Sequence, residues 1–171
     1  MGQTTFSGPV KSLAGFISAG VSNSVTTAVG ATLTVADNAG KQIYYTSTAA
    51  ATFTLPAVNT TAPSDPTDPN QANNYGATFD FVLSTTVTGN FVVQVNSSND
   101  TVVGTAIFGS GTTALVFSTA TASDTITLNG TTTGGVGGAT ITATVVGANR
   151  YKVNVVSGAT GAVATPFSAA V

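Results

Sequence analysis

A chain of 171 residues, 42% of them hydrophobic, is long enough to bury a sizeable core and too apolar for a disordered protein. It carries only four basic and six acidic side chains, with a net charge of −2, and it lacks histidine, cysteine and glutamate. Acid–base catalysis, nucleophilic catalysis and zinc binding draw mainly on those missing residues. The composition therefore predicts a protein that is not an enzyme, with no catalytic residue, no metal and no cofactor.

The low charge also limits the partners. Phosphate binding needs clustered Lys and Arg, so we expect no nucleic acid, and no apolar run approaches the roughly 18 residues of a membrane span. Charged residues make up 6% of the chain, against about 25% in ordinary soluble domains. Because charge keeps protein surfaces apart, we expect other subunits to cover much of this surface.

Residues 1–28 show no regular alternation of polar and apolar side chains. Phe6, Pro9, Leu13 and Phe16 are apolar anchors, spaced too irregularly for one amphipathic helix. No basic stretch precedes a long apolar run, so a secretory signal is not expected. We predict an extended N-terminal arm that packs along another subunit, with these anchors as candidate partner-binding residues.

After the arm, period-two alternation dominates, which is the pattern of half-buried strands. No stretch shows helical periodicity with caps. Short segments rich in Val, Ile, Thr, Phe and Tyr predict strands at Thr32–Val35, Gln42–Thr46, Thr52–Leu55, Ala77–Leu83, Phe91–Val95, Thr101–Ile107, Ala114–Ser118 and Thr125–Leu128. The fold predicted for residues 29–171 is a single all-β domain, an antiparallel β-sandwich or barrel of jelly-roll-like type.

The clearest local structure is a β-hairpin near the C-terminus. Segments 139–146 and 151–155 alternate strictly, and Gly147-Ala148-Asn149 between them tolerates the positive φ of a tight turn. The apolar face of this hairpin is expected to contribute to the core through Ile141, Val145, Val153 and Val155.

Two segments interrupt the strand pattern. Residues 56–76 contain four of the six prolines, which favours a projecting surface loop. Residues 130–138, GTTTGGVGG, predict a flexible connection or a site of close backbone approach. This glycine run lacks the Lys-Ser/Thr that would complete a phosphate-binding loop.

The remaining chemical candidates are weak. Asp65 and Asp68 in the proline loop could hold Ca²⁺, but known calcium loops have denser acidic spacing and a bidentate Glu, so two solvated acids are the favoured reading. Asp100 and Asp124 are interpreted as turn residues before strands. Serine nucleophiles have no histidine base, and nothing around the lysines supports a Ser–Lys pair.

Tyrosines offer one further possibility, a platform on which sugars stack. Tyr44 and Tyr45 are adjacent in a predicted strand and must point to opposite faces, so at most one of them could serve it. Packing in the core or at an interface is favoured for this pair. Tyr75, at the end of the proline loop, is kept as a candidate partner-binding residue.

Several stretches, together about half of the chain, resemble virion structural proteins of tailed bacteriophages, especially phages of marine bacteria and cyanobacteria. The N-terminal Thr4–Ser12, TTFSGPVKS, is similar to a common opening there. The segment 124–167 resembles their closing hairpin, with Tyr151 at an aromatic position and Pro166-Phe167 near the end. Residues 44–55 and 76–83 look like the aromatic strand, TLP and G-x-x-F segment of the same proteins.

The resemblance implies a small all-β capsid decoration (cement) protein that forms trimers over the joints between major capsid subunits. Its expected partners are the major capsid protein and copies of itself, and its expected place is the capsid surface of a virion assembled in the host cytoplasm. The alternative is a tail-fibre or receptor-binding module that contacts surface sugars through Tyr75, the proline loop and residues 130–138. A bacterial surface or pilus subunit is disfavoured by the missing export signal.

Overall fold

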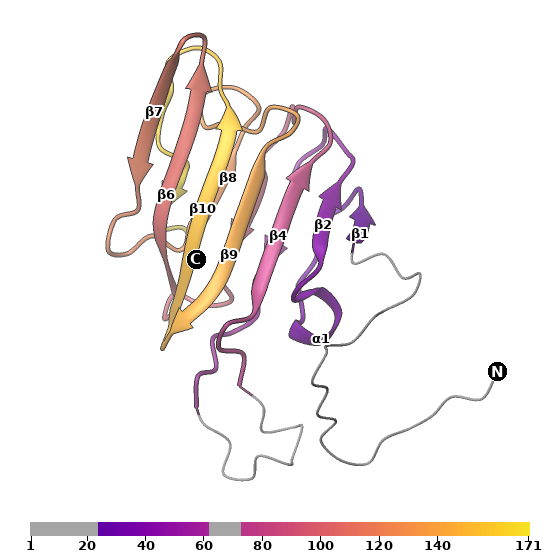
Figure 1. Cartoon of the computed structure of the whole chain (residues 1–171), viewed down its shortest axis with the longest axis vertical. Helices are drawn as coiled ribbons and strands as arrows, with labels where there is room; N and C mark the ends of the chain where they lie inside the picture. The colour runs from indigo at the N-terminus through magenta and orange to yellow at the C-terminus, as the bar shows by residue number, and fades with distance from the viewer. Residues whose placement is uncertain (1–23, 62–72) are drawn as a thin grey trace, which may run out of the picture.

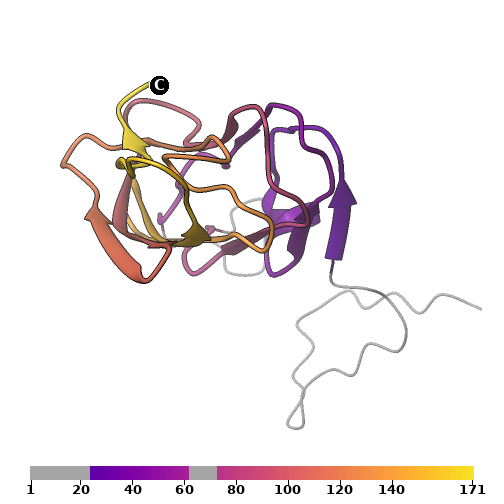
Figure 2. The ribbon, with the colours of Figure 1, turned by 90° about the horizontal axis from the view of Figure 1, so that it is seen from above.

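Two β-sheets pack face to face in the computed structural model, which describes residues 24–61 and 73–171. The large sheet has seven strands and the small sheet four, and the core lies between them (Figures 1 and 2). The predicted all-β sandwich is confirmed. Outside the described residues lie Phe6, Pro9, Leu13, Phe16, Asp65 and Asp68.

Strand order shows how the chain builds these sheets. In the large sheet the strands follow one another as β1 (Ser24–Thr27), β2 (Gln42–Tyr45), β4 (Thr78–Leu83), β9 (Thr140–Gly147), β10 (Arg150–Gly158), β6 (Thr101–Ser110) and β7 (Thr113–Ser118). In the small sheet the order is β11 (Phe167–Ser168), β8 (Thr125–Leu128), β5 (Phe91–Gln94) and β3 (Ala51–Thr54).

Both sheets are mixed, whereas we predicted antiparallel pairing. The pairs β1–β2, β2–β4, β3–β5 and β10–β6 run parallel, and the other neighbours run antiparallel. From β2 to β5 the chain alternates between the two sheets. As a result β4 lies parallel to β2 in the large sheet, and β5 lies parallel to β3 in the small sheet. Parallel pairing needs such crossovers, and alternation of side chains within one strand does not report them.

Most strands lie where the alternation predicts them, with β6 extending further, to Ser110. The predicted strand Thr32–Val35 is wrong. Thr32 makes only an isolated bridge to Thr54, and the chain then enters the short helix α1 (Val35–Asn38). Thr34 caps this helix, since its Oγ1 accepts a 3.1 Å hydrogen bond from the main-chain nitrogen of Asp37. Local capping by a Thr hydroxyl here outweighs strand propensity.

Short strands at both ends of the described chain escaped the sequence pattern. Ser24–Thr27, inside the predicted arm, forms β1 and pairs with β2, so the sheet begins before the predicted boundary at residue 29. Phe167–Ser168 forms β11 against β8. β11 has only two residues, and β1 holds a single apolar residue, Val25, so neither shows an alternation of apolar and polar side chains.

The core is largely aromatic and aliphatic. Tyr45, Phe53, Phe81 and Phe91 form a cluster of tilted and edge-on rings, with centroids 5.1–6.1 Å apart. Aromatic pairs in such geometries add to the free energy gained by burial. The four hairpin residues predicted for the core are all buried: Ile141, Val145, Val153 and Val155.

Turns confirm two further expectations. The β9–β10 hairpin turns through Ala148 and Asn149, and Asn149 has a φ of 55°. In the glycine-rich segment, Gly130 has a φ of 78°, and a Cβ there would lie 1.8 Å from the carbonyl oxygen of Val87. Of the two readings offered for residues 130–138, close backbone approach therefore holds at Gly130.

Candidate functional site

The exposed face of the large sheet is the broadest surface that the fold presents (Figure 1). Strand register aligns its outward-pointing side chains into rows that cross the sheet. One row runs through Thr26, Tyr44, Val82, Thr140, Val156, Ile107 and Val116. The next runs through Gln42, Asp80, Thr142, Asn154, Thr105 and Ser118.

Hydroxyl groups dominate the polar part of this face, and several are already paired. Thr142 donates from its Oγ1 to Oδ1 of Asp80 at 2.7 Å, and the Thr78 and Thr144 hydroxyls lie 3.0 Å apart. Among the described strand residues that point outward here, only Asp80, Arg150 and Lys152 are charged. Most of the side chains that this face offers to a partner are therefore neutral.

Three aliphatic residues form the exposed end of the first row. Val156, Ile107 and Val116 are 53%, 43% and 63% exposed and belong to the neighbouring strands β10, β6 and β7. We call them the aliphatic row. Because they are in register, they make one apolar strip that reaches the β7 edge of the sheet.

Strand β7 is itself poorly covered on both faces. Leu115 points to the inner side and is still 39% exposed, while Phe117 is partly buried against Phe108 with ring centroids 5.8 Å apart. Strand β6 is the sole neighbour of β7 among the described strands. An apolar edge strand of this kind is an unusual feature for an isolated monomer.

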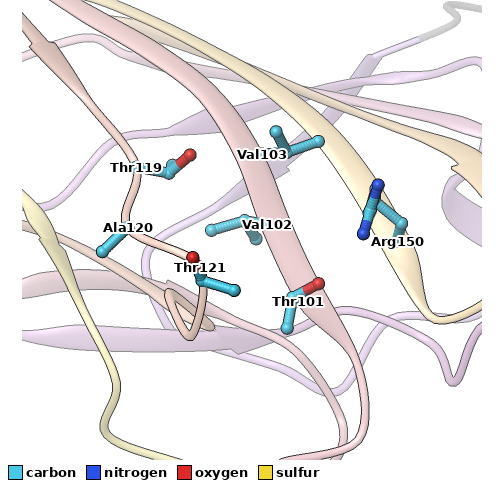
Figure 3. Close-up of a pocket in the computed structure, with 7 residues that line it drawn as sticks. All are labelled: Thr101, Val102, Val103, Thr119, Ala120, Thr121 and Arg150. Atoms are coloured by element: carbon cyan, nitrogen blue, oxygen red, sulfur yellow. The ribbon is translucent and has the colours of Figure 1, made fainter.

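A small hollow of about 260 Å³ lies beside β6, next to the segment that follows the end of β7 (Figure 3). Arg150 stands on one side of it and Thr119–Thr121 on the other, with Thr101–Val103 between them. Arg150 is the sole ionisable side chain of this lining. The hollow can donate hydrogen bonds to a carboxylate or hydroxyl of a partner, but its lining supplies no general base.

Tyr75 lies at the base of the proline loop and is 63% exposed. Its neighbour Asn74 is buried and joins the two ends of the loop. The Asn74 side chain accepts a 2.7 Å hydrogen bond from the Asn59 nitrogen and donates one of 2.8 Å to the Ala57 carbonyl oxygen. The loop base is therefore fixed, and it holds Tyr75 in a position where a partner can reach it.

Asp100 and Asp124, the two buried carboxylates of the described residues, serve the fold. Oδ2 of Asp100 accepts a 3.1 Å hydrogen bond from the nitrogen of Val58, and Oδ1 of Asp124 accepts one of 2.8 Å from the nitrogen of Ala170. Burial, together with the Asp100 carboxylate, raises the pKa of Tyr151, whose hydroxyl donates to the Pro56 carbonyl oxygen at 2.7 Å. These groups hold distant segments together.

Of the predicted partner-binding residues, Tyr75 alone falls within the described part, and it lies on the surface as expected. Sequence reasoning missed the β7 edge and the hollow at Arg150. The one available signal was the segment Thr113–Ser118, an uncharged strand without proline. Its place at a sheet edge follows only from the strand order.

Comparison with protein-family models, with curated protein sequences and with solved structures finds no match to this chain. Within residues 24–61 and 73–171, no three acidic, histidine or cysteine side chains gather into a group that could hold a metal ion. In the same described ranges, no helix is long and apolar enough to cross a membrane.

Proposed function

We propose that this chain is a non-enzymatic structural protein of a phage particle, a capsid decoration protein that binds the major capsid protein on the outer surface of the head. Its copies are proposed to associate as homotrimers. The observation that carries this role is the broad, nearly uncharged outer face of the large sheet, which ends in the aliphatic row.

The size of this face suits binding to another protein. Seven strands spaced about 4.8 Å apart span roughly 29 Å between the outermost strand axes, and a strand of about six residues is roughly 20 Å long. The resulting area, on the order of 600 Å², approaches the roughly 800 Å² that each partner contributes to a standard interface. One face of the sheet is thus nearly enough for a stable contact.

The chemistry of the face also favours a protein partner. Threonine hydroxyls and the Tyr44 side chain can exchange hydrogen bonds with main-chain or side-chain groups of a capsid subunit. Val156, Ile107 and Val116 add apolar area whose burial stabilises the complex. So few charges mean that little desolvation of ionic groups opposes docking.

The position of β1 supports a role for the predicted arm. The chain enters the described structure at Ser24, and β1 is an edge of the large sheet. A segment that leaves from an edge can reach a neighbouring subunit without crossing the outer face. We therefore keep Phe6, Pro9, Leu13 and Phe16 as proposed contacts with a neighbour or with the capsid.

Cryo-electron microscopy of native particles tests the proposal. The sandwich is expected as repeated density over the head lattice, with the outer face of the large sheet or the arm against the major capsid protein. A match of the sandwich to tail density alone would contradict it. In a matched reconstitution, purified protein should bind heads that lack it and raise the temperature at which they open, and serum albumin should do neither.

Exposure of Tyr75 on a fixed loop base favours one second candidate, a receptor-binding module of the tail. An exposed aromatic ring is a platform on which a sugar can stack. Binding to a panel of bacterial surface glycans, lost in Tyr75→Ala and kept in the half-buried control Tyr44→Ala, would support this second function over the first.

A further inference from the structure

Within residues 24–61 and 73–171, strand β7 has none of the usual protections of a sheet edge. Natural edge strands carry Lys or Pro, are very short, or are covered by another element. Thr113–Ser118 contains neither a charged residue nor proline, and five of its six side chains are exposed. The strand also ends the order of the large sheet, with β6 on one side and no described strand on the other.

Hydrogen bonding fixes which backbone groups of β7 face the open edge. The nitrogen of Thr119 donates to the carbonyl oxygen of Gly104 at 3.1 Å, so this pair lies in hydrogen-bonded register. Antiparallel ladders alternate between hydrogen-bonded and non-hydrogen-bonded pairs. Ala114, Val116 and Ser118 therefore direct their N–H and C=O groups away from β6. These groups form a ready template for another strand.

We infer that β7 pairs with β7 of a second copy of this chain, antiparallel and across a two-fold axis at Val116. Residues opposite each other in paired strands point to the same face of the sheet. With the axis at Val116, this residue faces its own counterpart, and Ala114 faces Ser118 of the second copy. All three residues with edge-directed backbone groups then take part in hydrogen bonds.

The aliphatic row argues for a second copy as the occupant. Val116 ends the row that starts at Val156 and passes through Ile107. The two-fold axis joins this row to an identical one, so the exposed apolar strips of the two copies become continuous. On the inner face the same register sets Leu115 opposite Phe117 of the second copy and covers both.

A foreign strand could satisfy the same backbone groups, but symmetry makes the side chains of a second β7 match on both faces at once. Charge does not oppose the pairing, because the net charge is only −2 and β7 carries none. The pairing does not depend on a role on capsids. In the proposed homotrimer it would join one trimer to another, since each copy uses its β7 edge once.

A single-cysteine experiment tests the register, because the natural chain contains no cysteine. Hydrogen-bonded antiparallel partners have Cα atoms about 5.5 Å apart, which is within the range that a disulfide spans. Purified Val116→Cys under mild oxidation should run mostly as a linked dimer on a non-reducing gel. The control Val29→Cys, at a residue 69% exposed and outside β7, should stay unlinked. Equal linking of both variants overturns the pairing.

A charge at the axis tests the contact itself in purified protein without capsids. Val116→Lys sets two like charges opposite each other across the paired β7 strands. The dissociation constant of this β7–β7 contact should rise more than about tenfold. The mass measured by light scattering should then fall to half that of the natural chain. Val103→Lys, on β6 beyond the end of β7 and 42% exposed, should keep the full mass.

An equal mass for Val116→Lys and the natural chain, whether both are monomers or both trimers, overturns the proposal. If Val116→Lys loses its β-sheet circular dichroism, it has unfolded, and the comparison of Val116→Cys with Val29→Cys then decides whether the β7 strands pair. Failure of the pairing and failure of the capsid role are distinguishable. The pairing is tested in purified protein, whereas the capsid role is tested with phage particles.

Discussion

The carboxylate of Asp124 accepts a 2.8 Å hydrogen bond from the main-chain nitrogen of Ala170, 46 residues further along the chain. The same oxygen accepts from the Thr125 hydroxyl at 2.7 Å, and Asp124 is buried. A carboxylate so placed joins the start of β8 to the last described residues. Its hydrogen bonds therefore stabilise the contact between these two parts of the chain.

Asp124→Ala should therefore destabilise the fold. Hydrogen bonds to a charged group contribute about 1.5–3 kcal/mol each. The substitution removes the acceptor of the buried Thr125 hydroxyl and of the main-chain nitrogen of Ala170. We expect a loss of about 2–4 kcal/mol in the free energy of unfolding, measured with urea. Asp124→Asn keeps one acceptor and should lose less. An Ala variant within about 0.5 kcal/mol of the natural chain would contradict this role.

Ile141→Ala tests the hairpin face that the alternation predicts. Ile141 is fully buried, and truncation of such a residue costs about 2–5 kcal/mol. The neighbouring Thr140→Ala, on the outer face, should change the free energy of unfolding by less than about 0.5 kcal/mol. Equal effects of the two substitutions would show that the faces are wrongly assigned.

Tyr151 gives a dependence of stability on pH at the alkaline end. Burial and Asp100 raise the pKa of Tyr151 above its ordinary value of 10.0 in the folded chain. Below pH 10.0 both states keep the proton, so the contribution is constant. Above it the unfolded chain loses the proton first, so the free energy of unfolding falls as pH rises.

Tyr151→Phe should remove this alkaline decline and cost about 1 kcal/mol near neutral pH, because it deletes the hydrogen bond to Pro56. The exposed Tyr75→Phe serves as its control and should leave both quantities unchanged. The free energy of unfolding is measured from pH 7 to 11 for the natural chain and both variants. The prediction fails if Tyr151→Phe shows the same pH dependence as Tyr75→Phe.

Two glycines separate backbone strain from steric clash. Gly130 and Gly161 have similar positive φ values of 78° and 75°, but only at Gly130 would a Cβ meet another atom within 4 Å. Gly161→Ala should cost about 1–2 kcal/mol from the left-handed backbone alone. Gly130→Ala should cost clearly more, because its Cβ collides with the Val87 carbonyl. Similar melting temperatures for the two variants would refute the close approach.

Removal of residues 1–23 tests the arm. The deletion leaves β1 intact, so the sandwich should keep its circular dichroism and its cooperative unfolding. Each buried Phe or Leu contributes about 1.5–3 kcal/mol, so loss of the proposed anchors should weaken trimers or particle binding. Full assembly and decoration by the shortened chain would mean that the arm makes no such contact.

The candidate surface was only partly predictable from the sequence. Exposure of Tyr75 follows from its place beside a proline-rich loop, as expected. The aliphatic row is different, because Val156, Ile107 and Val116 look like ordinary strand residues in three separate segments. They become one surface only through the parallel pairing of β10 with β6 and the antiparallel pairing of β6 with β7.

Local periodicity was enough to determine the all-β class, most strand positions, the β9–β10 turn at Asn149 and the buried faces of its strands, because alternation decides which side of a strand meets the core. Tertiary structure alone decided the mixed sheet order, the exposed edge at β7 and the roles of Asp100 and Asp124. The carboxylates of Asp100 and Asp124 bond to residues 42 and 46 positions away, and period-two alternation specifies the face of a strand but not its neighbour.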